Sequence, residues 1–149
     1  MKILENYKKI KKTFLDLKKN TNKIVLCHGV FDVLHLGHIK HFKEAKQKGD
    51  ILVVSVTSDN FVNKGFGRPY YSLKIRMQTL EALSDIDYII PSNFPTSEHN
   101  LDLIRPNVYC KGPDYKNEPD ITGNLKKEKK ILKKFKGKIF FTSDMLLSS

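Results

Sequence analysis

The sequence is poor in cysteine, in long apolar runs and in groupings of metal-ligand residues. It has only 2 cysteines among 149 residues, which is too few for a disulfide framework. Cys27 and Cys110 each lie in an apolar segment, so we expect two buried, reduced thiols. No apolar run approaches the roughly 20 residues of a membrane-spanning helix, and the first residues lack the apolar core of a signal peptide. We therefore expect a soluble, cytoplasmic protein with no membrane partner and no metal ligands of its own.

Nucleic-acid binding has no support in the sequence apart from its charge. Lys and Arg total 27 against 16 Asp and Glu, which gives a formal net charge of +11. Such a surface attracts polyanions, triphosphates included. Much of the excess is lysine within residues 126–138, and runs of this kind are usually a solvated helix face. Because no zinc finger or RNA-binding signature accompanies the charge, we expect no nucleic-acid partner.

Apolar segments typical of helices and of strands alternate along the chain. An amphipathic helix is predicted over residues 1–19, and the first strand begins at residue 24. Further strands are predicted over residues 51–57, 88–90, 108–111 and 138–142, and further helices over 35–48, 72–83, 97–104 and 122–135. This alternation predicts an α/β fold, with an open, mostly parallel five-stranded sheet, helices on both faces and a single domain of residues 1–149. Ligands bind such sheets at the carboxyl ends of the strands.

Residues 23–48 carry the strongest chemical signal. A β-branched apolar run leads to a turn at Gly29, and helical spacing begins near Leu36, so His35 and His38 lie where a strand passes into a helix. The first amides of a helix lack intrahelical partners and favour a bound phosphate. Two imidazoles would add donors, and Gly37 between them would let the backbone approach the anion closely. The pattern favours a phosphate site, with a helix cap and a surface imidazole as the alternative.

These residues resemble a known family signature. His35-Leu36-Gly37-His38, preceded by Gly29-Val30-Phe31-Asp32, resembles the HxGH motif of the cytidylyltransferase-like nucleotidyltransferases, which have a Rossmann-like fold. Residues 64–69 (KGFGRP), Arg76, residues 87–90, residues 111–115 (KGPDY) and the final Ser148-Ser149 follow in the family's order. Within the family, the chain is most similar to glycerol-3-phosphate cytidylyltransferase and to the adenylyltransferase half of bifunctional heptose kinase/adenylyltransferases.

The resemblance implies a reaction. An oxygen of the substrate phosphate attacks the α-phosphorus of a nucleoside triphosphate, and pyrophosphate leaves without a covalent enzyme intermediate. Catalysis then depends on alignment and on donors that stabilise developing charge. Mg²⁺ is expected to arrive with the triphosphate, held mostly by phosphate and water oxygens.

The resemblance also implies which residues take part. Those in catalysis would be His35, His38, Lys64 and Arg76. Those that bind the nucleotide would be Gly29, Val30, Phe31, Asp32, Gly37, Arg68, Lys111, Gly112, Asp114, Ser148 and Ser149.

Several of these residues have a plain structural alternative. Lys64 could be a solvated loop lysine, and Arg76 an exposed helix arginine. Arg68 could reach the phosphates or only fix its loop, and Asp32 could orient the site or act on the substrate. The segment of residues 111–115 could be an ordinary Gly-Pro turn.

Two departures from the family affect the choice of substrate. The family continues past the serine pair into a helix, whereas this sequence stops at Ser149, so we expect one domain of a longer chain, for example one fused to a sugar kinase. The arginine that cytidylyltransferases of this type carry shortly before the serine pair is absent. We favour CTP narrowly over ATP, a phosphorylated sugar or polyol as acceptor, and a homodimer. The alternatives are an ATP-dependent adenylyltransferase acting on a heptose or sugar phosphate, and a non-catalytic nucleotide-binding module.

Overall fold

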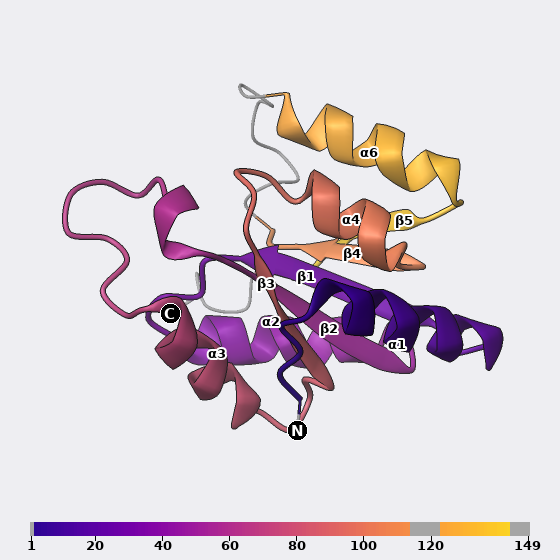
Figure 1. Ribbon diagram of the computed structural model, residues 1–149, viewed down its shortest axis with the longest axis horizontal. Coiled ribbons are helices and arrows are strands. Elements are labelled where there is room, and N and C mark those ends of the chain that lie inside the picture. The colour runs from indigo at the N-terminus through magenta and orange to yellow at the C-terminus, as the bar shows by residue number, and fades with distance from the viewer. Residues whose placement is uncertain (1, 114–122, 144–149) are drawn as a thin grey trace.

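A five-stranded sheet forms the centre of the molecule. The computed structural model describes residues 2–113 and 123–143. The strand order is β3-β2-β1-β4-β5 (Figure 1), and each neighbouring pair is parallel. The strands are β1 (Ile24–Gly29), β2 (Ile51–Thr57), β3 (Tyr88–Ser92), β4 (Val108–Lys111) and β5 (Lys138–Phe141). The helices are α1 (Tyr7–Lys19), α2 (Leu36–Lys46), α3 (Leu73–Glu81), α4 (Glu98–Ile104) and α6 (Asn124–Lys134), with a short 3₁₀ helix, η1 (Asp59–Phe61).

Helices cover both faces of the sheet, which confirms the predicted α/β, Rossmann-like fold class (Figure 1). On one face, Phe42 of α2 and Leu80 of α3 pack with Val54 of β2. On the other face, the core is formed by α1, α4 and α6, for example by Phe14 and Leu101. Both faces of β2 are therefore buried, which explains why apolar residues follow one another along most of the strand without alternating.

The N-terminal helix begins later than the sequence predicts. Its first helical residue is Tyr7, because the side chain of Asn6 caps the helix by accepting a hydrogen bond from the Lys9 amide. The residues before Asn6 instead pair with the edge strand β3. The Leu4 amide donates to the Ile89 carbonyl at 2.9 Å. The prediction of a helix over residues 2–6 was wrong, although the amphipathic helix itself is confirmed.

The strand order reverses between β1 and β4. Strand β1 pairs with β2 on one side and with β4 on the other, so the segments that leave β1 and β4 diverge. This reversal is the place where open α/β sheets bind ligands. Cys27 and Cys110 lie opposite each other across these two strands, and both are free and buried, as expected. Among the described residues, no helix is long and apolar enough to cross a membrane.

Candidate active site

His35 and His38 cap the amino end of α2 reciprocally. His35 is the N-cap residue, and its Nδ1 accepts a hydrogen bond from the Gly37 amide at 3.0 Å. The His35 amide in turn donates to Nδ1 of His38 at 3.2 Å. Two amides that would otherwise lack partners are satisfied by imidazoles, in the manner of a capping box. The helix cap is therefore real, but it occupies only one nitrogen of each ring.

The cap fixes the tautomer of both rings. A backbone amide can only donate, so Nδ1 of His35 and of His38 must accept, and each ring carries its proton on Nε2. Desolvation, with added effects of His35, His41 and Lys64, lowers the pKa of His38 to about 4. His38 is thus neutral at pH 7. The pair presents two Nε2–H donors, with ring centroids 4.1 Å apart, at the positive end of the helix.

Phe31 supports the ring of His38. The two rings meet edge to face with centroids 5.9 Å apart, and Phe31 also packs on Phe42 of α2. A Cβ on Gly29 would lie 2.8 Å from the Phe31 ring, so glycine at this position makes room for it. The backbone of Phe31 has a φ of 50°, which is uncommon for a bulky residue. Gly29 and Phe31 therefore position His38, and their contact with the nucleotide stays a prediction.

Asp32 fixes the loop that follows β2. Its side chain is 1% exposed. One carboxylate oxygen accepts hydrogen bonds from Nε of Arg68 at 2.9 Å and from the Tyr70 amide at 2.6 Å, and the other accepts from the Tyr71 amide at 2.9 Å. The guanidinium of Arg68 also lies over the Tyr70 ring. Of the alternatives stated above, these contacts favour loop fixing for Arg68 and orientation for Asp32.

The same loop carries Lys64 close to the histidine pair. Lys64 is exposed, and its charge is one of the causes of the lowered pKa of His38. A lysine within electrostatic reach of His38 could approach an anion bound by the two donors. The part of Lys64 in catalysis stays a prediction.

Asp32→Asn should destabilise the protein at neutral pH and much less in acid. Burial raises the pKa of the Asp32 carboxyl, but the amides of Tyr70 and Tyr71 and the Arg68 side chain outweigh it and hold the pKa below its usual value. The stability that this carboxylate contributes is present above the unfolded pKa of about 3.9 and is lost as the pH falls through the folded pKa. We expect a loss of about 1–3 kcal/mol at pH 7.

Urea unfolding of wild type and variant at pH 7 and at pH 3 checks this expectation. Asp102→Asn is a matched control, because Asp102 pairs with Arg105 on the surface, where its side chain is 60% exposed. Its effect should stay within about 0.5 kcal/mol. An equally large loss for Asp32→Asn at both pH values would show that the carboxylate charge is not the cause.

Arg76 lies inside the protein and not on the helix surface. The residue is 1% exposed. Its Nη1 donates to the carbonyls of Val30 at 2.8 Å and Thr57 at 2.7 Å. Its Nε donates to the Tyr71 carbonyl at 2.9 Å, and Nη2 lies 2.6 Å from Asp59. The alternative of an exposed arginine was wrong. Arg76 ties the ends of β1 and β2 to the start of α3, and its contact with phosphates stays a prediction.

Lys111 is also paired inside the protein. Its side chain is 11% exposed, and Nζ lies 2.6 Å from the Glu128 carboxylate of α6. Glu128 accepts two more hydrogen bonds, from the Ser97 hydroxyl at 2.5 Å and the Tyr109 hydroxyl at 2.7 Å. This set of contacts joins β4, α4 and α6, so Lys111 positions the end of β4 at the strand-order reversal.

The remaining predicted residues lie at or beyond the end of β4. An added Cβ on Gly112 would meet no atom within 4 Å, so the space beside this residue is open. Asp114, Ser148 and Ser149 lie outside the described residues. Their predicted contact with the nucleotide stays a prediction.

Sequence reasoning missed a polar group around His28. This residue is near the end of β1, and its Nδ1 lies 3.0 Å from the Ser55 hydroxyl of β2. Both residues interrupt segments that are otherwise apolar. A polar residue near the carboxyl end of a buried strand was the available signal, because that is where ligands meet such sheets.

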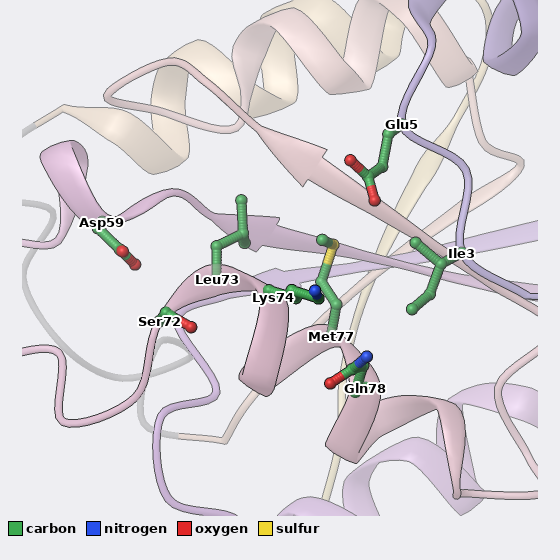
Figure 2. A pocket seen from close by; sticks show the side chains of 8 residues that line it. All are labelled: Ile3, Glu5, Asp59, Ser72, Leu73, Lys74, Met77 and Gln78. Atoms are coloured by element: carbon green, nitrogen blue, oxygen red, sulfur yellow. The ribbon is translucent and has the colours of Figure 1, made fainter.

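A separate cavity of about 370 Å³ lies between α3 and the N-terminal segment (Figure 2). It is lined by Ile3, Glu5, Asp59, Ser72, Leu73, Lys74, Met77 and Gln78. Among residues 2–113 and 123–143, none of the predicted catalytic or nucleotide-binding residues lines it. Asp59, the partner of Arg76, is shared between this cavity and the candidate site.

Known proteins resemble this chain in sequence. The cytidylyltransferase-like family model matches residues 26–145. A protein named bifunctional protein HldE from a Nitratiruptor species is 33% identical over 137 residues, which is 91% of this chain and 30% of that protein. The protein of the same name from Helicobacter pylori is 38% identical over 125 residues, 83% of this chain and 27% of that protein. The chain thus spans less than a third of the length of these relatives.

Solved structures share the fold. A lipopolysaccharide core biosynthesis protein from Thermoplasma volcanium superposes with a TM-score of 0.68 at 28% identity, covering 83% of this chain and 98% of that chain. A pantoate-beta-alanine ligase from Francisella tularensis, with a TM-score of 0.62 at 22% identity, covers 95% of this chain and 66% of that chain, and is similar in fold alone. The sequence match over residues 26–145 and the shared fold agree with the resemblance found at the HxGH motif. The chain belongs to the cytidylyltransferase-like family of nucleotidyltransferase enzymes.

Proposed function

We propose that this chain is an adenylyltransferase that transfers AMP from ATP to a heptose phosphate or a similar sugar phosphate and releases pyrophosphate. An oxygen of the acceptor phosphate forms the new bond to the α-phosphorus of ATP. The bond from the α-phosphorus to the bridging oxygen breaks, and its electron pair leaves with pyrophosphate. The protein supplies alignment and charge stabilisation, so no side chain needs to form a covalent bond.

The observation that carries the proposal is the reciprocal cap of His35 and His38. Because both Nδ1 atoms are engaged by amides, both Nε2–H groups are held as donors before any substrate arrives. Donors fixed in this way stabilise phosphate oxygens as charge moves toward the leaving group, and one of them typically contributes about 3–4 kcal/mol. Lys64, within electrostatic range of His38, would add a cation over the triphosphate. A module that only bound nucleotide would not need donors fixed at the reacting phosphates.

The identity of both substrates rests on the relatives. Their name, bifunctional protein, and the lipopolysaccharide core biosynthesis protein of similar fold agree better with the adenylyltransferase half of a heptose kinase/adenylyltransferase than with glycerol-3-phosphate cytidylyltransferase. The absent arginine before Ser148 agrees with this as well. These observations favour ATP over CTP, and a sugar phosphate over glycerol phosphate.

Magnesium belongs to the proposal as a companion of the triphosphate. Across residues 2–113 and 123–143, no group of three or more His, Cys, Asp or Glu side chains could hold a metal ion. Mg²⁺ would be held mostly by phosphate and water oxygens, and it would neutralise charge on the leaving pyrophosphate.

ATP should be preferred over CTP with a heptose phosphate as acceptor. We expect a ratio of kcat/KM of about tenfold or more, which corresponds to about 1.4 kcal/mol in the transition state. Pyrophosphate release with each nucleotide and the same acceptor measures it, and glycerol 3-phosphate serves as the control acceptor. A tenfold preference for CTP would reinstate the cytidylyltransferase assignment. Nucleotide binding by calorimetry without turnover on any acceptor would support the non-catalytic module.

A further inference from the structure

A series of hydrogen bonds, buried at Asn100 and part-buried at His28, runs across the carboxyl ends of three strands on the face that α4 covers. Asn100 of α4 donates from Nδ2 to the Pro91 carbonyl of β3 at 3.1 Å and to the Ser55 hydroxyl of β2 at 2.7 Å. The Ser55 hydroxyl lies 3.0 Å from Nδ1 of His28 on β1. Asn100 and Ser55 are both 0% exposed. Buried polar groups are costly unless paired, so this arrangement constrains every member.

The Pro91 carbonyl decides which group donates and which accepts in each of these hydrogen bonds. The Pro91 carbonyl can only accept, so the amide nitrogen of Asn100 must face it, and the second N–H of that nitrogen goes to Ser55. Ser55 accepts from Asn100 and therefore gives its single proton to Nδ1 of His28. The ring of His28 then carries its own proton on Nε2. Within the part of the chain that the structure describes, Nε2 of His28 makes no hydrogen bond.

The position of His28 puts this donor at the strand-order reversal. His28 is two residues before Val30, in the strand that lies between β2 and β4. Glu128 and Lys111, which joins the end of β4 to α6, act electrostatically on its ring. Burial lowers the pKa of His28 to about 4, so the imidazole is neutral at pH 7.

Two buried polar atoms near these hydrogen bonds support a role for this region in ligand binding. Oδ1 of Asn100 and Oγ of Ser92 are buried and lack a hydrogen-bond partner among the described residues. Ser92 ends β3, next to Pro91 in the chain. Buried polar atoms of this kind are few in native proteins and gather at functional positions. His28, Ser55 and Asn100 are thus linked by hydrogen bonds near the carboxyl ends of β1 and β2, and Ser92 lies at the carboxyl end of β3.

We propose that His28 is a specificity-determining residue whose Nε2–H donates to a sugar hydroxyl of a substrate, and that Ser55 and Asn100 are positioning residues that fix its tautomer. The inference rests on the proposed function, which supplies two such sugars, the ribose of the nucleotide and the sugar of the acceptor. A neutral donor suits an uncharged hydroxyl oxygen, whereas the phosphates meet the donors of His35 and His38. Rejection of an analogue that lacks a recognised hydroxyl is the expected mark of such a contact.

A cycle of variants and deoxy substrates tests the proposal. Wild type and His28→Phe are compared with ATP, 2′-deoxy-ATP and 3′-deoxy-ATP, and with sugar phosphates that lack single hydroxyls. In wild type, loss of the recognised hydroxyl should raise KM for that substrate by roughly tenfold or more. In His28→Phe that KM is already raised, and the same deoxy substrate should cause no further increase. If the rise in KM that His28→Phe abolishes is seen with a deoxynucleotide, His28 contacts the ribose. If it is seen with a deoxy sugar phosphate, His28 contacts the acceptor.

Further variants separate recognition from folding. His28→Gln keeps a donor near the position of Nε2 and should recover part of the affinity, and Ser55→Ala should weaken it through the lost tautomer control. His99→Ala is the control, because His99 is an exposed histidine of α4. The same comparison of variants and deoxy substrates is repeated with binding affinity, measured by calorimetry, as the readout. Because this readout needs no turnover, a failure of catalysis would count against the proposed function only. If His28→Phe folds and every deoxy substrate costs it as much as it costs wild type, His28 does not bind a sugar hydroxyl.

Discussion

His35→Ser should reduce kcat by about 10²–10³-fold while leaving the stability of the protein nearly unchanged. Serine is among the best N-cap residues, so the variant can still accept the hydrogen bond that His35 now accepts from the Gly37 amide. What it loses is the Nε2–H donor. His38→Ala should lose turnover to a similar extent, because His38 holds the other Nε2–H donor of the pair. Steady-state pyrophosphate release and thermal unfolding measure the two effects separately.

His99→Ala provides the matched control for the loss of an imidazole. His99 is exposed on α4 and stacks on Phe94, away from the capping pair in sequence. We expect its rate to stay within about twofold of wild type, as for other surface substitutions. Normal kcat in both His35→Ser and His38→Ala would rule out the phosphate site at the start of α2.

Arg76→Met should destabilise the fold by about 3 kcal/mol or more, because backbone carbonyls lose the charged donors that now reach them. The guanidinium now satisfies three backbone carbonyls, of Val30, Thr57 and Tyr71. A methionine would leave the buried Thr57 carbonyl without a partner, at about 1–3 kcal/mol, and would remove the donors of the two part-buried carbonyls. Turnover should fall as well, because the ends of β1 and β2 would no longer be held together. Urea unfolding at pH 7 gives the loss in free energy.

Asp59→Asn separates the ion pair from the carbonyl contacts. The Asp59 side chain is 48% exposed, so its pairing with Arg76 is screened, and we expect a loss of at most about 1 kcal/mol. A loss below about 1 kcal/mol for Arg76→Met itself would contradict the structural role. Arg76→Lys adds a further distinction: retained stability with lost turnover would support the predicted contact with phosphates.

The strand-to-helix transition at His35 could be predicted from sequence because its causes are local. Apolar runs, a turn glycine and helical spacing all lie within residues 23–48. The partners of Arg76 are not local, since Val30 lies 46 residues away and Thr57 lies 19 residues away. An arginine on a helix surface and an arginine in a buried site can have the same neighbours in the sequence. Only the folded arrangement distinguishes them.

The start of α1 shows a different limit. Ile3, Tyr7, Ile10 and Phe14 fit one helical stripe, yet Ile3 lies beside β3 and pairs with Ile89. The spacing of apolar residues predicts that a residue is buried, but it does not predict which secondary-structure element the residue belongs to. The capping side chain of Asn6 decides the boundary, and an asparagine within a lysine-rich segment is a weak signal for a cap. The sequence does not decide the role of Asp32 for a similar reason, because its hydrogen-bond partners lie 36 to 39 residues away.

The neutral state of His38 bears on how the product would leave in the proposed reaction. Imidazolium groups would bind pyrophosphate with charge-assisted hydrogen bonds, which are roughly twice as strong as neutral ones. The uncharged Nε2–H group of His38 would instead stabilise the developing charge and then release an anion that Mg²⁺ and solvent also attract. Fast turnover would then depend on keeping the His38 ring free of a second proton, a state that the His35 amide favours by donating to Nδ1.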